Sequence, residues 1–164
     1  MSQTLWAPWR MEYIVGPKTE GCVFCEAAAS DDDARHLILA RGESAFVIMN
    51  RYPYSHAHIM VVPKRHVSCL EDLSAEERGG FFELVARAQA AVKEAFDPGG
   101  MNLGMNLGKA AGAGIADHLH MHVLPRWEGD TNFMPMVAGL RVMHEHLEET
   151  RDKLLPFFEG MSEG

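Results

Sequence analysis

Cysteine is scarce in this sequence, and long apolar runs are missing. The 164 residues include three cysteines, Cys22, Cys25 and Cys69, and a small, odd number argues against a disulfide framework. No stretch of 18 consecutive apolar residues occurs, so we expect no transmembrane helix and no membrane partner. The first residues have the pattern neither of a signal peptide nor of a transit peptide, which predicts a cytoplasmic protein.

Basic residues are outnumbered by acidic ones. Lys and Arg total 15 and Asp and Glu total 23, which gives a formal net charge of −8 with neutral histidines. A chain this acidic repels polyanions at long range, so a nucleic acid polymer is not an expected partner. A small anionic ligand is compatible with the charge, because backbone N–H groups in a local pocket can bind it.

The composition is that of a soluble globular domain. Apolar residues make up 47% of the chain and charged residues 23%, both near the usual values. We expect residues 1–20, which contain Trp6 and Trp9, to form an N-terminal packing segment, because exposed tryptophans are costly. Residues 21–164 are expected to form a single domain.

The apolar pattern predicts five strands and one long helix. Ser74 and Glu77 have the spacing of a capping box, and the apolar positions that follow indicate a helix to about Phe96. Residues 140–158 have a weaker helical pattern. Short turns join most of the strands, which favours an α+β fold with a largely antiparallel sheet. The strands are expected at residues 37–40, 45–50, 57–63, 101–107 and 118–124.

Three histidines alternate along the last of these strands. His118, His120 and His122 would share one face, each about 7 Å from the next, while the apolar residues between them face the core. A row of imidazoles gains nothing in packing, and each ring must find hydrogen-bond partners. The pattern is therefore typical of a functional site. It is compatible with metal ligands or with a nucleophilic imidazole that its neighbours orient.

A loop rich in small residues precedes this strand. Gly108, Gly112 and Gly114 leave backbone N–H groups free to approach a ligand, and such loops bind phosphate oxygens. The position of the loop, directly before the histidines, favours phosphate chemistry at an imidazole over metal binding by all three rings.

The motifs resemble those of the histidine-triad (HIT) family, in its branch that acts on diadenosine polyphosphates. The segments that carry this resemblance are HLHMHVL at 118–124, FVIMNR at 46–51, HIMVVPKRH at 58–66, PRWEGD at 125–130 and NFMP at 132–135. It covers roughly residues 5–155. The resemblance implies the HIT-like fold, a mostly antiparallel sheet of five to seven strands with one long helix and a C-terminal helix. It also implies a homodimer built on the helix at 74–96 and an adjacent strand.

The resemblance also implies roles for individual residues. His120 would be the nucleophile that takes the α-phosphate as a nucleotidyl-histidine, supported by His122 and His58. Asn50 would bind the ribose hydroxyls. Asn106, together with the loop Gly108–Gly114, would hold phosphate oxygens. Where many relatives have Gln followed by Ser or Thr before the triad, this chain has Gly114 and Ile115, so a side-chain hydroxyl is missing there.

The pair Cys22 and Cys25 has the spacing of half a zinc site. A redox pair has the same spacing, but no strand-then-helix context of the thioredoxin kind surrounds it. The resemblance to HIT and to related galactose-1-phosphate uridylyltransferase sequences suggests His66 and His118 as the other two ligands. The four residues would then form a closed structural zinc site.

We therefore interpret the chain as a nucleotide hydrolase or nucleotidyltransferase that cleaves dinucleoside polyphosphates through His120, with no organic cofactor. One alternative is a diadenosine tetraphosphate phosphorylase, with phosphate as acceptor. A second is a metallohydrolase that uses all three triad histidines, although the outer two would lie about 14 Å apart along a strand. A third is a nucleotide-binding module without catalysis that uses Trp6 and Trp9 to bind a protein partner.

Overall fold

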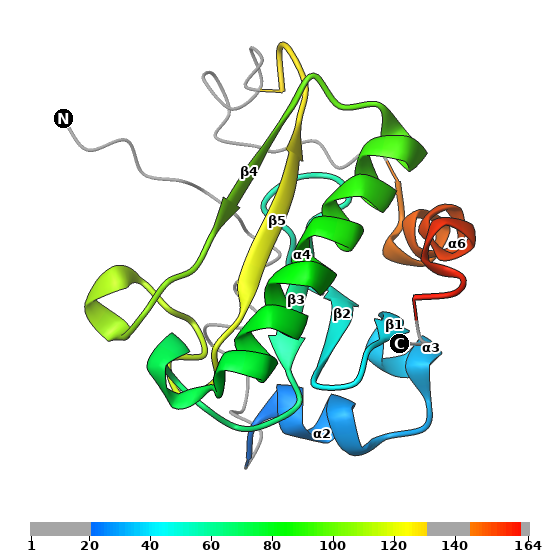
Figure 1. Cartoon of the computed structure of the whole chain (residues 1–164). Coiled ribbons are helices and arrows are strands. Elements are labelled where there is room, and N and C mark those ends of the chain that lie inside the picture. Colours follow the sequence, from blue (N-terminus) through cyan, green and yellow to red (C-terminus); the bar gives the residue numbers. More distant parts are fainter. Residues whose placement is uncertain (1–20, 131–144, 162–164) are drawn as a thin grey trace, which may run out of the picture.

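The computed structural model describes residues 21–130 and 145–161. Within them the chain forms a five-stranded antiparallel sheet with strand order β1-β2-β3-β5-β4 (Figure 1). The predicted α+β fold with a mostly antiparallel sheet is thus confirmed. The strands are β1 (Ile38–Arg41), β2 (Ala45–Met49), β3 (Ile59–Pro63), β4 (Gly100–Gly104) and β5 (Met121–Arg126).

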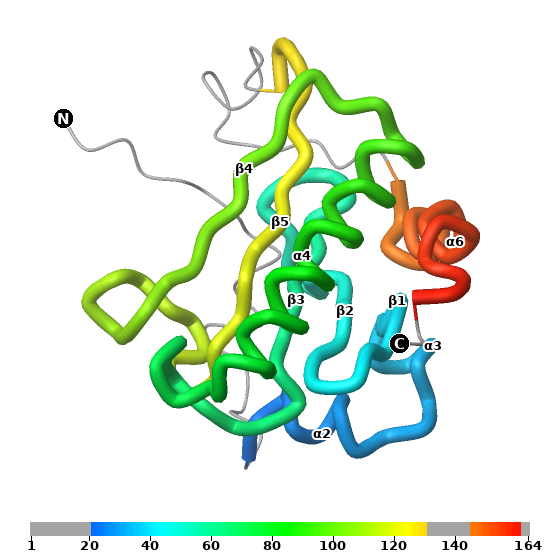
Figure 2. Tube along the Cα trace, in the orientation of Figure 1, coloured from blue at the N-terminus to red at the C-terminus, as the bar shows by residue number. Residues whose placement is uncertain are grey.

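Helices cover both faces of the sheet. The long helix α4 crosses β2, β3 and β5 on one face, and α6 lies beside α4 and β1 (Figures 1 and 2). Strand side chains alternate between faces, so Val47 and Val61 pack with α4, whereas Phe46 and Met60 pack with Phe24 of α2 on the other face. The bounds of these three helices are Val23–Ala29 for α2, Ala75–Phe96 for α4 and Leu147–Phe158 for α6.

The predicted capping box begins α4. The hydroxyl of Ser74 accepts the backbone N–H of Glu77 at 3.1 Å, and the carboxylate of Glu77 accepts the N–H of Ser74 at 2.7 Å. The helix ends at Phe96, and Asp97 follows in the left-handed region with φ 42°. The apolar face predicted for this helix is mostly buried, at Phe81, Leu84, Val85, Ala88 and Val92, whereas Ala95, its last predicted member, is half-buried.

Several elements differ from the prediction. The expected helix at 140–158 is α6 over Leu147–Phe158, and residues 140–144 lie outside the described part of the chain, as does the predicted packing segment 1–20. Among the described residues, no helix has both the length and the apolar composition needed to cross a membrane. The sequence reading missed α2, α3 (Asp33–His36) and the 3-10 turns η2 (Leu70–Asp72) and η3 (Lys109–Ala111).

The strand that carries the histidines begins later than predicted. β5 starts at Met121, so His118 and His120 precede it. The β3–β5 register pairs Val61 with Met121, and its continuation would place Leu119 opposite Pro63. Proline has no N–H for the ladder, and the carbonyl of Pro63 lies 2.8 Å from Nε2 of His118. Pairing therefore stops before the first two histidines.

Candidate active site and metal centre

A pocket lies on the α2 face of the sheet. Its apolar wall comes from α2 and from the sheet beneath it, and includes Val23, Phe24, Ala27, Ile48, Met60 and Ile115. Polar side chains line another part of it, among them Asn50, Asn106, His120 and His122. A pocket with a mainly apolar wall and a few convergent polar groups is the usual form of a small-molecule site.

The neutral ring of His120 is held in one tautomer. Nδ1 lies 2.8 Å from the backbone carbonyl oxygen of His118. A carbonyl only accepts hydrogen bonds, so Nδ1 carries the proton and Nε2 keeps its lone pair. The side chain is buried, and burial lowers the pKa of His120 because it disfavours the imidazolium. His120 therefore offers an unprotonated nitrogen in a pocket.

A second chain of hydrogen bonds orients His122. The backbone N–H of Tyr54 donates to Nδ1 of His58 at 3.1 Å, which assigns the proton of His58 to Nε2. That Nε2 lies 2.9 Å from Nδ1 of His122. Nδ1 of His122 consequently accepts, and its own proton lies on Nε2. The rings of His120 and His122 are 4.9 Å apart between centroids, so a lone pair and an N–H donor are presented side by side.

The predicted substrate-binding residues are only partly brought together. Asn50, Asn106 and Gly114 line the pocket. The side-chain oxygen of Asn50 accepts the backbone N–H of Tyr52 at 2.9 Å, which leaves its amide group for other contacts. Gly108 and Gly112 do not line the pocket; they flank η3 with positive φ values of 79° and 83°.

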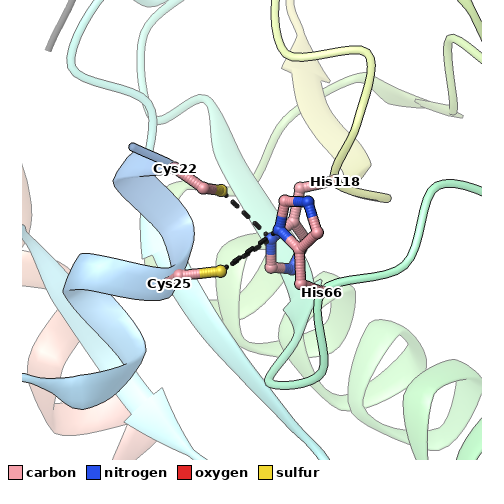
Figure 3. A group of neighbouring side chains, drawn as sticks. All are labelled: Cys22, Cys25, His66 and His118. Atoms are coloured by element: carbon pink, nitrogen blue, oxygen red, sulfur yellow. Dashed lines mark hydrogen bonds between the residues drawn. The ribbon is translucent and has the colours of Figure 1, made fainter. Parts of the chain in front are cut away.

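Cys22, Cys25, His66 and His118 converge on one point (Figure 3). One ligand atom from each lies within 4.8 Å of every other. Figure 3 shows both sulfur atoms, at the start of α2, pointing toward the two imidazoles. His120 and His122 are not part of this group. The triad is thus divided between two sites, because His118 belongs to the cysteine group and the other two belong to the pocket.

The four residues fit a tetrahedral divalent ion. Zn–S bonds of about 2.3 Å and Zn–N bonds of about 2.0 Å place S and N roughly 3.5 Å apart in a tetrahedron. The observed distances from Nδ1 of His118 to the two sulfurs are 3.2 and 3.6 Å. Nε2 of His118 faces the carbonyl of Pro63 at 2.8 Å, so Nδ1 is the nitrogen with the lone pair. Burial also lowers the pKa of His118, which favours the neutral ligand form.

The sequence reading missed two contributors to this region. One is Tyr54, whose backbone sets the tautomer of His58 and whose ring stacks on that histidine at 5.1 Å. The other is Phe24, whose ring lies 5.2 Å from that of His120. The position of Phe24 between the two cysteines could have predicted this contact, because a metal site that includes Cys22 and His118 brings the turn with Phe24 close to the triad.

An antiparallel sheet with a histidine-lined pocket and an adjacent Cys2His2 group defines an α+β protein of the histidine-triad class. The model of the HIT domain matches residues 33–129, and the chain belongs to the HIT family. It is 38% identical over 157 residues to "AP-4-A phosphorylase" of Mycobacterium tuberculosis, covering 91% of this chain and 80% of that protein. "Bis(5'-adenosyl)-triphosphatase" of Dictyostelium discoideum is 29% identical over 123 residues, with 71% and 82% covered.

Solved structures of the same family share the fold. A hypothetical histidine triad nucleotide-binding protein from Sulfolobus tokodaii superposes with a TM-score of 0.68 at 25% identity, covering 85% of this chain and 93% of that one. A Zn-bound histidine triad family protein from Mycobacterium smegmatis gives a TM-score of 0.67 at 29% identity, with 84% and 93% covered.

Proposed function

We propose that this enzyme cleaves dinucleoside polyphosphates of the diadenosine tetraphosphate type, with Nε2 of His120 as the nucleophile. The observation that carries the proposal is the hydrogen bond from Nδ1 of His120 to the carbonyl of His118. It leaves the lone pair on Nε2, in a pocket that also contains Asn50 and His122. The names of the relatives, a phosphorylase and a triphosphatase of adenosine polyphosphates, support this substrate class.

The reaction has two steps. In the first, Nε2 of His120 forms a bond to the α-phosphorus, the bond to the bridging oxygen breaks, and the nucleoside polyphosphate leaves as an oxyanion. The N–H of His122 donates to a phosphoryl oxygen and stabilises the charge that develops there. In the second step, an acceptor oxygen bonds to phosphorus and the N–P bond breaks. When water is the acceptor, its oxygen becomes part of the phosphate of AMP, AMP leaves, and a proton from the water goes to solvent.

Phosphate is the second candidate acceptor. The relative named "AP-4-A phosphorylase" matches 91% of this chain. Gly114 and Ile115 line the pocket, so no side-chain hydroxyl is available at these two positions to assist the leaving group. Incubation with diadenosine tetraphosphate separates the two candidates. AMP with ATP indicates hydrolysis, and ADP with ATP formed only in the presence of phosphate indicates phosphorolysis.

The nucleophile is tested by His120→Asn. We expect turnover to fall by at least about 10⁴-fold, as for the loss of other covalent nucleophiles, with the circular dichroism spectrum unchanged. His146→Asn is the matched control, because His146 is exposed at the start of α6 and its side chain makes no cap bond. Native turnover in His120→Asn would refute the assignment of the nucleophile.

We also propose that Cys22, Cys25, His66 and His118 bind a zinc ion. Such an ion supplies cross-linking of the chain and no open coordination position for substrate. The ligands come from the start of α2, from the segment after β3 and from the segment before β5. The site would therefore join α2 to the segment that carries His120.

A cytoplasmic homodimer is our proposal for the assembly. β4 is an edge strand of the sheet, and an exposed edge with apolar side chains is a template for pairing with another chain. Leu103 in β4 and Leu107 just after it are 42% and 45% exposed. Phe82 of α4 is also exposed. These residues support an interface that uses α4 and β4. We also propose that residues 21–164 form a single domain.

A further inference from the structure

The short helix α2 forms one wall of the pocket and is fixed at its C-terminal end by Arg41. The guanidinium donates to the carbonyls of Ala27, Ala28 and Ser30 at 3.0, 2.9 and 2.6 Å. They lie at the end of the helix, where carbonyls have few partners within the helix itself, although that of Ala27 also accepts the backbone N–H of Ser30 at 3.3 Å. Arg41 also pairs with Asp33 at 2.8 Å. The C-terminal end of α2 is therefore attached to β1 independently of any metal.

The N-terminal end of α2 is attached differently. Cys22 caps the helix without a side-chain cap bond, and the contacts that its sulfur and that of Cys25 make are with the imidazoles of the metal centre. A helix of seven residues is too short to be stable in water by itself. The packing of Phe24 in the core supports this end, and the ligand group formed by Cys22, Cys25, His66 and His118 fixes the position of its first residues.

Phe24 connects the metal centre to the pocket. Its side chain is 2% exposed. The ring meets that of His118 edge-on at 5.4 Å and that of His120 in a tilted contact at 5.2 Å. The same residue lines the pocket together with Val23. One aromatic ring thus touches a metal ligand, the proposed nucleophile and the space where a nucleotide would lie.

We propose that metal binding sets the affinity of the pocket for a nucleotide, with Phe24 as the positioning residue that couples the two sites. The inference rests on the proposed function, because it takes the pocket to be a nucleotide site. With the ion bound, the first turn of α2 is held against His118, and Phe24 completes the apolar wall. Without the ion, the Arg41 contacts and the packing of Phe24 in the core remain, but the first turn loses its link to His118 and holds the ring of Phe24 less firmly against the pocket. Coupling of this kind is reciprocal, so a nucleotide tightens metal binding by the same factor.

The test is AMP binding to the full chain by titration calorimetry, with zinc loaded and after removal by a chelator. We expect removal of zinc to weaken AMP binding on the order of tenfold, while circular dichroism shows that the domain is still folded. The coupling factor is the Kd for AMP without zinc divided by the Kd with zinc. Phe24→Ala should bind AMP weakly in both states, so its coupling factor should be close to one. Phe24→Tyr, which keeps the ring, should restore most of the coupling. Phe157→Ala is the matched control, since Phe157 is half-buried on α6, does not line the pocket and should leave the factor unchanged.

Each other outcome has a definite meaning. Equal AMP affinity in the loaded and metal-free forms overturns the coupling and leaves the proposed function intact. Global unfolding after zinc removal also overturns it, because the ion would then hold the whole domain rather than α2. A coupling factor in Phe24→Ala equal to that of the native chain removes Phe24 from the proposal. If the zinc-loaded native protein neither binds AMP nor cleaves diadenosine tetraphosphate, the proposed function fails and this inference fails with it.

Discussion

Nε2 of His58 lies 2.9 Å from Nδ1 of His122, and this contact joins the residue before β3 to the second residue of β5. Both rings also contact Tyr54, by stacking on His58 at 5.1 Å and edge-on to His122 at 5.9 Å. His58 is 1% exposed, so its polar atoms need partners within the protein. The contact with His58 fixes which nitrogen of His122 carries its proton, and His58 is not one of the three triad histidines.

Removing His58 should therefore impair catalysis more than binding. In His58→Ala the tautomer of His122 is no longer fixed, and we expect kcat to fall about 10- to 100-fold, the usual cost of losing a residue that orients a ligating or catalytic imidazole. The Kd for AMP should change by much less. Steady-state kinetics with diadenosine tetraphosphate and calorimetry with AMP measure the two quantities. A loss of AMP affinity equal to the loss in kcat would contradict this role for His58.

The cysteine group should determine the metal content and part of the stability. In Cys25→Ser we expect zinc, measured by atomic absorption, to fall well below one ion per chain. The melting temperature should drop by about 10 °C, since a ligand at about 1,000 times its Kd stabilises a protein by roughly 4 kcal/mol. Cys69→Ser is the control, because Cys69 is half-buried and lies outside the group. Equal zinc content in the two variants would exclude Cys25 as a ligand.

The sequence predicted the parts of the site that regular spacing determines. Strand alternation brought out His118, His120 and His122, and the Cys-x2-Cys spacing brought out the two cysteines. The resemblance added His58 and His66 and assigned His118 to the zinc site. What it could not predict depends on long-range register. Pairing between β3 and β5 stops near Pro63, which has no N–H. For that reason His118 and His120 precede β5 instead of lying within a regular strand.

The helix α2, beside the pocket, was not predicted for a related reason. Seven residues from Val23 to Ala29 are too few for a helical period to be recognised, and such a helix depends on tertiary contacts. Those contacts come from Arg41 and from His118, which follow α2 by more than 10 and nearly 100 positions. The long helix α4 was predicted to within one residue at each end, because its capping box and its apolar face are both local.

The edge of the sheet provides a prediction about assembly. Leu103→Glu places a carboxylate on β4, where Leu103 is 42% exposed and β4 has no second neighbour among the described strands. We expect the native chain to sediment as a dimer and the variant as a monomer, because a buried, unpaired charge in an interface is costly. Ala34→Glu, which adds a carboxylate at an exposed position of α3, should remain dimeric. A monomeric native chain at micromolar concentration would contradict the proposed dimer.

The start of α4 gives a prediction about stability in acid. Glu77 has a pKa lowered to about 2, first through its hydrogen bonds with Arg65 and then through the backbone at Ser74. The guanidinium of Arg65 donates to the two carboxylate oxygens of Glu77 at 2.9 and 2.8 Å. A carboxyl whose pKa is lower in the folded than in the unfolded state contributes stability above the unfolded value, 4.5 in the reference state. That contribution is lost as pH falls from this value toward 2.

Glu77→Gln should therefore lower the melting temperature at pH 7, and the difference from the native chain should shrink as pH falls from 5 toward 2. The amide cannot take part in the ion pair with Arg65, so it has no charge-assisted contact to lose on acidification. Melting curves at several pH values measure this convergence. Glu76→Gln makes the same change of charge one residue earlier in the first turn, where Glu76 is exposed and forms no ion pair within the described part of the chain, and should give a smaller difference at pH 7. A gap between Glu77→Gln and the native chain that stays constant down to pH 2 would show that the carboxylate of Glu77 is not what stabilises this end of α4.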